Sequence, residues 1–209
     1  MSKFFFIERK SKKINSPLII LIHGYGSNER DLFSLIDYFP SDAYVISLRA
    51  PKELFNDSYA WYDIYIDGNN KFYDHKTAAL IRDELSHFID DISKNPNIDA
   101  HNITLIGFSQ GAIISHAISF SYPEKIKNIM ALSGVIDEKI MKKTNLIPKT
   151  NIYISHGTND NVIDYEMSKE SLNFYTKNNI DFQFESYNQG HGINQENLES
   201  MIKWLKGNV

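Results

Sequence analysis

Short apolar runs alternate along this chain with longer stretches in which apolar residues recur every three or four positions. The run 18–22 is apolar at every position, which is typical of a central strand in a sheet covered on both faces. The pattern predicts strands at residues 4–8, 18–22, 43–48, 102–106, 126–132, 151–155 and 182–187. It predicts helices at residues 29–39, 74–95, 112–118, 165–177 and 195–206. Strands that alternate with helices indicate an α/β fold with a mostly parallel central sheet and helices on both faces.

Two connections lie outside this pattern. Residues 49–70 show no clear period, and we expect them to be irregular, with Trp61-Tyr62-Asp63-Ile64 as their most apolar part. The connection between the strands 126–132 and 151–155 holds only about twenty residues, which is typical of an ordinary crossover. Neither segment is long enough to form a cap domain over the sheet. The sequence has no internal repeat, low-complexity tract or linker, so residues 1–209 are predicted to form a single domain.

Composition narrows the functions to consider. The net charge is −4 at pH 7 with the histidines neutral, so no basic surface argues for a nucleic-acid partner. The chain has no cysteine, which excludes disulfides, a cysteine nucleophile and thiolate metal ligands. The apolar run 4–7 is too short for a secretory signal, and 18–22 is far shorter than a membrane span. We therefore expect a cytoplasmic protein with no stable membrane association.

One pentapeptide, Gly107-Phe108-Ser109-Gln110-Gly111, lies between the predicted strand 102–106 and the predicted helix 112–118. A Gly-x-Ser-x-Gly sequence at such a junction is typical of a nucleophile elbow, a tight turn that holds a serine hydroxyl clear of the sheet. Its glycines are required because a Cβ at either position would clash with the neighbouring strand or helix. The alternative is a glycine-rich turn with a passive serine. A base, an acid and an oxyanion loop elsewhere in the chain would favour the elbow.

A serine hydroxyl becomes a nucleophile only beside a base that a carboxylate orients. Functional loops gather at the carboxyl ends of parallel strands, so the partners of Ser109 are expected just after later strands. Asp160 follows the strand 151–155, and His191 follows the strand 182–187 between two glycines. The order serine, aspartate, histidine is the one that α/β-hydrolases use.

Two other carboxylates compete with Asp160 for the orienting role. Asp137 also follows a predicted strand, and Asp164 is expected to cap the helix 165–177. Among the histidines, His23 and His156 each precede a glycine at a strand end, where we expect them to brace a loop by hydrogen bonding. The spacing of histidines and carboxylates suggests no metal site.

Hydrolysis of an acyl group also needs N–H donors for the oxyanion of the tetrahedral intermediate. One donor is expected from the residue after the nucleophile, here the backbone N–H of Gln110. The other is expected from the loop after an early strand, where Tyr25 lies between Gly24 and Gly26. That loop does not match a dinucleotide fingerprint, because Glu29 stands where the third glycine is needed and would repel a pyrophosphate.

These motifs together resemble the carboxylesterase/phospholipase family of α/β-hydrolases, which includes the acyl-protein thioesterases and small bacterial esterases. The segments that carry the resemblance are Leu21-Ile22-His23-Gly24-Tyr25-Gly26, Trp61-Tyr62-Asp63-Ile64, the pentapeptide around Ser109, Ala131-Leu132-Ser133-Gly134, His156-Gly157-Thr158-Asn159-Asp160 and Gly190-His191. The resemblance implies hydrolysis of carboxylic esters or thioesters by Ser109, His191 and Asp160 without a cofactor. It also places the segment around Trp61 near an acyl pocket, although a core aromatic is an equal interpretation.

The chain departs from the family pattern at two places. Ala112 replaces a second glycine that is usual after the elbow, and Asn161 and Asp164 stand where the family often has prolines. Both departures leave substrate preference open. The favoured function is a serine carboxylesterase for short-to-medium acyl esters or thioesters, with an acyl-protein thioesterase or a lysophospholipase as alternatives. A catalytically silent binding protein is the alternative from another class, and whether the chain forms a homodimer is left open.

Overall fold

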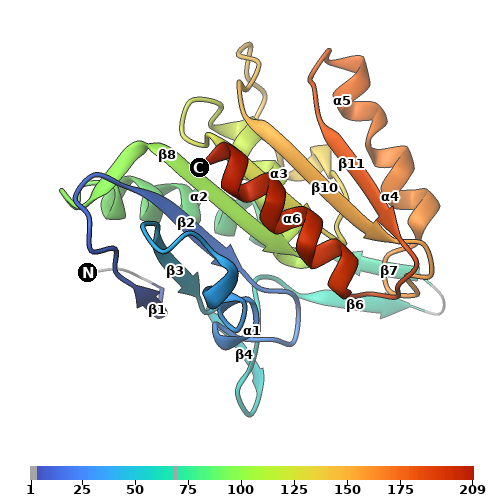
Figure 1. Ribbon diagram of the computed structural model, residues 1–209. Coiled ribbons are helices and arrows are strands. Elements are labelled where there is room, and N and C mark those ends of the chain that lie inside the picture. Colours follow the sequence, from blue (N-terminus) through green and yellow to red (C-terminus); the bar gives the residue numbers. More distant parts are fainter. Residues whose placement is uncertain (1–3, 68–69) are drawn as a thin grey trace.

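A computed structural model describes residues 4–67 and 70–209 of the protein. Within that part, one large sheet has seven strands in the order β1-β3-β2-β8-β9-β10-β11 (Figure 1). Its strands are β1 (Phe6–Arg9), β2 (Ser16–Ile22), β3 (Tyr44–Leu48), β8 (Ile98–Phe108), β9 (Asn128–Leu132), β10 (Asn151–Gly157) and β11 (Gln183–Tyr187). Only the edge strand β1 pairs antiparallel with its neighbour, and all other described pairs in this sheet are parallel. The expected mostly parallel sheet is therefore confirmed.

Helices cover both faces of this sheet. Helices α2 (His75–Ile92), α3 (Gln110–Ser121), α4 (Tyr165–Ser171) and α5 (Asn173–Lys177) lie on one face, whereas α1 (Arg30–Phe33) and α6 (Gln195–Asn208) lie on the other (Figure 1). Successive residues of β2 point to opposite faces, so Leu18 and Ile20 join the first core while Ile19 and Leu21 join the second. This two-sided burial explains why the strand is apolar at every position.

Helices α2 and α3 differ in how they are stabilised. Helix α2 begins at an N-cap, Asp74, whose carboxylate accepts hydrogen bonds from the N–H groups of Lys76 and Thr77, and it buries one apolar stripe. Helix α3 is buried along its whole length because it packs against β8, β9 and α2. The helix that follows Ser109 is thus an interior element.

Two predicted helices are shorter or broken in the structure. Residues 29–39 form only α1 and a 3-10 turn, η1 (Ile36–Tyr38), instead of one helix. Pro40 has no N–H to offer the Ile36 carbonyl, and Arg9 Nη1 donates to that carbonyl instead, at 2.8 Å. The predicted helix 165–177 divides into α4 and α5 at Leu172, next to Ser171, whose hydroxyl bonds the Ser168 carbonyl.

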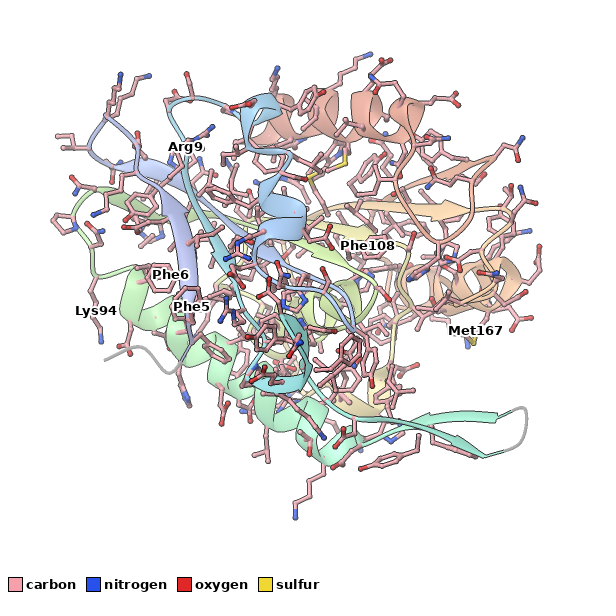
Figure 2. The ribbon with its side chains drawn as sticks, turned by 90° about the horizontal axis from the view of Figure 1, so that it is seen from below. Phe5, Phe6, Arg9, Lys94, Phe108 and Met167 are labelled. Carbon is pink, nitrogen blue, oxygen red and sulfur yellow. The ribbon has the colours of Figure 1, made fainter. Side chains whose placement is uncertain are left out.

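The segment 49–70 was expected to be irregular, and this prediction is wrong for most of it. The structure has one hairpin of β4 (Lys52–Phe55) and β5 (Ser58–Ala60), and a second of β6 (Ile64–Asp67) and β7 (Asn70–Tyr73). Residues 68–69 lie outside the described part of the chain. The second hairpin projects from the body of the molecule (Figure 2). Between β9 and β10 the chain forms one 3-10 turn, η2 (Glu138–Ile140).

No helix in residues 4–67 and 70–209 is both long enough and apolar enough to cross a membrane.

Candidate active site

Ser109 occupies a strained turn between β8 and α3. Its φ of 54° and ψ of −113° fall where a residue with a Cβ rarely sits, and Ser109 N donates to the Leu132 carbonyl at 2.9 Å. The turn depends on its two glycines. A Cβ built on Gly107 would lie 2.3 Å from the Gly111 carbonyl oxygen, and one built on Gly111 would lie 1.9 Å from the Ile22 carbonyl oxygen. The local sequence therefore folds as the elbow that its spacing predicted.

The neighbouring Ala112 accounts for one departure from the family pattern. A Cβ built on Gly134 would lie 2.5 Å from the Ala112 methyl group. Gly134 follows β9 on the adjoining strand, so the absence of a side chain there leaves room for the methyl group on α3. The helix packs closely against the sheet despite the substitution.

His191 and Asp160 meet at the carboxyl ends of β10 and β11. His191 Nδ1 lies 2.7 Å from Asp160 Oδ2, and the His191 ring centroid lies 4.9 Å from that of Phe108, the residue before Ser109. Phe108, labelled in Figure 2, is the last residue of β8 and is partly buried against the core. A Cβ on Gly157 would lie 2.3 Å from the Gly190 carbonyl oxygen, so this glycine lets the two loops touch. The pairing leaves His191 Nε2 as the ring nitrogen free to face a substrate.

Asp160 is fixed by backbone donors as well as by His191. Its Oδ1 accepts from the N–H groups of Val162 at 2.8 Å and Ile163 at 2.9 Å, and its side chain is fully buried. Burial alone would raise the pKa of Asp160, but the hydrogen bonds from His191 and the two backbone N–H groups outweigh it and lower that pKa below its ordinary value. Asp160 is therefore an ionised acceptor at neutral pH.

A second buried imidazole lies on the same carboxylate. His156 Nε2 is 2.9 Å from the Ile163 carbonyl and 3.3 Å from Asp160 Oδ2. Both partners are acceptors, so Nε2 carries the proton, and burial lowers the pKa of His156 and keeps the ring neutral. The predicted bracing histidine thus reaches the acid itself. The sequence analysis did not identify this contact, and the four-residue spacing between His156 and Asp160 was the only signal for it.

The two competing carboxylates bond elsewhere. Asp137 accepts from the Tyr73 hydroxyl and the Lys139 N–H, and its Oδ2 lies 3.3 Å from His75 Nε2. Asp164 caps α4 by accepting from the Met167 N–H at 3.1 Å, as its position predicted. The structure therefore brings Asp160, rather than Asp137 or Asp164, to His191.

Gln189 is a residue of this site that the sequence reasoning missed. Its side-chain Nε2 donates to the Gly192 carbonyl, and its Oε1 accepts from the Asn194 N–H, each at 2.7 Å. The Gln189 side chain therefore bridges two backbone groups of the loop that carries His191. Its place two residues before His191, next to Gly190, was the available signal.

The loop after β2 approaches the elbow from the opposite side. A Cβ built on Gly24 would lie 3.1 Å from Phe108 Cδ1 and 3.3 Å from Ser109 Cβ, so a larger residue here would press on the elbow. Gly26, with φ of +79°, donates its N–H to the Tyr59 carbonyl of the first hairpin at 2.8 Å. Tyr25 itself is 42% exposed, and its N–H makes no hydrogen bond within the described residues.

Gln110 and Trp61 complete the set of predicted residues. The Gln110 N–H lies at the first position of α3, where no preceding turn supplies an acceptor. Trp61 is 1% exposed and belongs to the core that includes Tyr62, so its indole is a core aromatic and lines no open surface. Within the described residues, no group of three or more His, Cys, Asp or Glu side chains could hold a metal ion.

A mostly parallel sheet with a strained serine between strand and helix, and an acid–base pair on the loops after β10 and β11, defines an α/β-hydrolase. The family model for phospholipase/carboxylesterase matches residues 3–209, and the chain belongs to that family. It is a serine ester hydrolase.

Individual relatives agree with this assignment. The chain is 31% identical to acyl-protein thioesterase 1 of Candida albicans over 212 residues, which cover 91% of each chain. It is 23% identical over 195 residues to the putative hydrolase MhqD of Bacillus subtilis, covering 93% of this chain and 95% of MhqD. Among solved structures, a Bacillus cereus carboxylesterase superposes with a TM-score of 0.86 at 26% identity, covering 100% of this chain and 96% of the esterase.

Proposed function

We propose that Ser109, His191 and Asp160 act together to hydrolyse a carboxylic ester or thioester through an acyl-enzyme. In the first step, His191 Nε2 takes the proton of the Ser109 hydroxyl while Oγ bonds to the acyl carbon. The bond to the leaving alcohol or thiol then breaks, and His191 returns the proton to that group. Water repeats the sequence on the acyl-enzyme, releasing the acid and restoring Ser109.

The other roles follow from this reaction. The N–H groups of Tyr25 and Gln110 stabilise the oxyanion of each tetrahedral intermediate, since both are backbone donors beside the nucleophile. Asp160 holds the His191 ring with its proton on Nδ1 and stabilises the imidazolium that forms. The single observation that carries the proposal is the 2.7 Å contact between His191 Nδ1 and Asp160 Oδ2, on loops that follow β10 and β11 in the same sheet whose strand β8 leads into the strained Ser109. A silent binding protein has no need of such a pair.

The substrate we propose is a small ester or thioester with a short-to-medium acyl chain. Apolar side chains are exposed on the loops that carry the site, with Tyr25 42% and Val162 46% exposed. The 3-10 turn between β9 and β10 offers no cap to enclose a long chain. Similarity to a fungal acyl-protein thioesterase makes an acyl thioester the first alternative substrate. A single catalytic domain and a cytoplasmic location belong to the same proposal.

A fluorophosphonate probe tests the nucleophile directly, because only an activated serine displaces its fluoride and forms a phosphonyl ester. We expect labelling of the wild-type protein at Ser109, located by peptide mass spectrometry. Ser133 offers a matched control, since it also follows a strand and has a positive φ, of 51°. Ser133→Ala is expected to label fully, and Ser109→Ala not at all. Equal labelling of the two variants would contradict the proposal.

A further inference from the structure

The two proposed oxyanion donors lie on separate elements of the fold. The Tyr25 N–H belongs to the loop after β2, and the Gln110 N–H to the start of α3. A single oxygen must lie about 2.7–3.1 Å from both donors, and a misplacement of about 1 Å costs about a hundredfold in rate. The relative position of the loop and the helix therefore affects the rate.

The segment Trp61-Tyr62 is tied to both elements by buried hydrogen bonds. Trp61 Nε1 donates to the His23 carbonyl at 2.8 Å, which fixes the loop after β2. On the other side, the Gln110 side chain accepts from Trp61 N at 3.1 Å and donates to the Tyr62 carbonyl at 2.9 Å. All four residues are at most 3% exposed, so water does not compete for these bonds.

The His23 side chain also influences the direction of the first donor. Ala50 N donates to His23 Nε2 at 3.1 Å, so the proton of the neutral ring is on Nδ1, which lies 2.7 Å from the Gly24 carbonyl oxygen. Gly24 C=O and Tyr25 N–H belong to one planar trans peptide and point in opposite directions. A carbonyl held by His23 thus aims the Tyr25 N–H away from it.

We propose that Trp61 is a positioning residue that sets the separation of the two oxyanion donors. It acts through His23 on one side and through the Gln110 side chain on the other, and it does not touch the substrate. This inference rests on the proposed function. It differs from a role for Trp61 in an acyl pocket. A residue that positions the oxyanion donors affects the transition state of every substrate, whereas a residue that lines the pocket affects substrate binding according to acyl chain length.

The test uses two variants that remove the ties one side at a time. Trp61→Phe keeps an aromatic ring but loses the Nε1 donor to His23. Gln110→Met keeps the backbone N–H and approximate shape but loses both side-chain bonds. For each variant we expect kcat to fall about 10- to 100-fold with KM changed less than about threefold, for short and longer acyl esters alike. The inhibition constant of a trifluoromethyl ketone, whose adduct places an oxyanion at this position, should rise by the same factor.

A control removes a buried hydrogen bond elsewhere in the core. Tyr175 is fully buried, and its hydroxyl lies 2.5 Å from His116 Nδ1 on α3. Tyr175→Phe is expected to lower the melting temperature without changing kcat or the ketone inhibition constant. Unchanged kcat in Trp61→Phe, or a rise in KM that grows with acyl chain length, would overturn the inference.

Further results separate a failure of this inference from a folding defect and from a failure of the proposed function. If Trp61→Phe does not fold, Gln110→Met decides alone, since its backbone donor is retained and full activity would overturn the inference. Loss of activity in Ser109→Ala together with full activity in both positioning variants would mean that only this inference fails. Retained activity in Ser109→Ala would instead mean that the proposed function fails.

Discussion

His191 Nδ1 and Asp160 Oδ2 lie 2.7 Å apart, although 31 residues separate them in the chain. Neighbouring parallel strands, β10 and β11, bring them together, because each residue lies on the loop that follows its strand. The Thr158 N–H donates to the Tyr187 carbonyl at 2.8 Å, and the Asn159 N–H to the Gln189 carbonyl at 3.0 Å, so the two loops are joined by backbone bonds. The acid–base pair is therefore built into the edge of the sheet.

Replacing the acid should remove most of the activity. Asp160→Asn is expected to lower kcat by about 10³- to 10⁴-fold, because an amide cannot hold the His191 proton on Nδ1 or stabilise the imidazolium. Asp137→Asn and Asp164→Asn serve as controls, and each should lose less than about threefold. Steady-state kinetics on one soluble ester compares the three variants. A larger loss at Asp137 than at Asp160 would move the acid to the loop after β9.

Activity should depend on the ionisation of His191. His191 acts as a base only in its neutral form, so kcat/KM should rise with pH in the acid range and then level off. The pKa of Asp160 is lowered, so this carboxylate is already ionised at neutral pH. Burial lowers the pKa of His23 and His156, and that of His116 to about 3, so these rings are neutral at neutral pH. A pH–rate profile that is flat from pH 5 to 9 would contradict this mechanism.

The elbow should be intolerant of a methyl group at Gly111. A Cβ there would lie 1.9 Å from the Ile22 carbonyl oxygen, so β2 or α3 has to move. Gly111→Ala is expected to lower the free energy of unfolding by about 1–3 kcal/mol or more, measured by urea denaturation. Gly207 in α6 provides the control, because a Cβ there meets nothing within 4 Å. Gly207→Ala should leave stability unchanged or raise it by up to about 1 kcal/mol. Equal effects of the two substitutions would contradict the packing argument.

The parts of the structure predicted from the sequence are those that depend on local pattern. The strands have the alternation or continuous apolar character that burial imposes, and Ser109 lies in a motif whose glycines serve a local steric need. Asp160 and His191 could be proposed because parallel strands bring their following loops to one edge. These inferences needed only the order of elements along the chain.

The parts that could not be predicted depend on contacts between distant residues. The helix expected at 29–39 breaks at residues 34–35, and beyond the break Arg9, 27 residues away from Ile36, donates to the Ile36 carbonyl. Trp61 is bonded to His23 and Gln110, at separations of 38 and 49 residues, so its burial has no local signature. The short hairpins between residues 52 and 73 likewise gain order by pairing, including the bridge from Tyr59 to Ser27, and their sequence carries little periodicity.

Substrate length should matter in a limited way. A site without a cap gains about 0.8 kcal/mol, or about fourfold in kcat/KM, for each buried methylene until the apolar wall ends. We therefore expect specificity constants that rise from acetate esters to medium chains and then level off or fall. Initial rates should show no jump when the substrate passes its solubility limit. A sharp increase at that limit would indicate a lid that opens at an interface, as in a lipase.

The central claim is that Ser109 forms the acyl-enzyme, and kcat of Ser109→Ala tests it most directly. The hydroxyl is a small part of a well-packed turn, so the variant should fold with a circular dichroism spectrum and a melting temperature close to those of the wild type. We predict that its kcat for a soluble short-chain ester falls by several powers of ten, with a small residual rate from the oxyanion donors. A folded Ser109→Ala variant that retains even about a tenth of the wild-type kcat would contradict the mechanism.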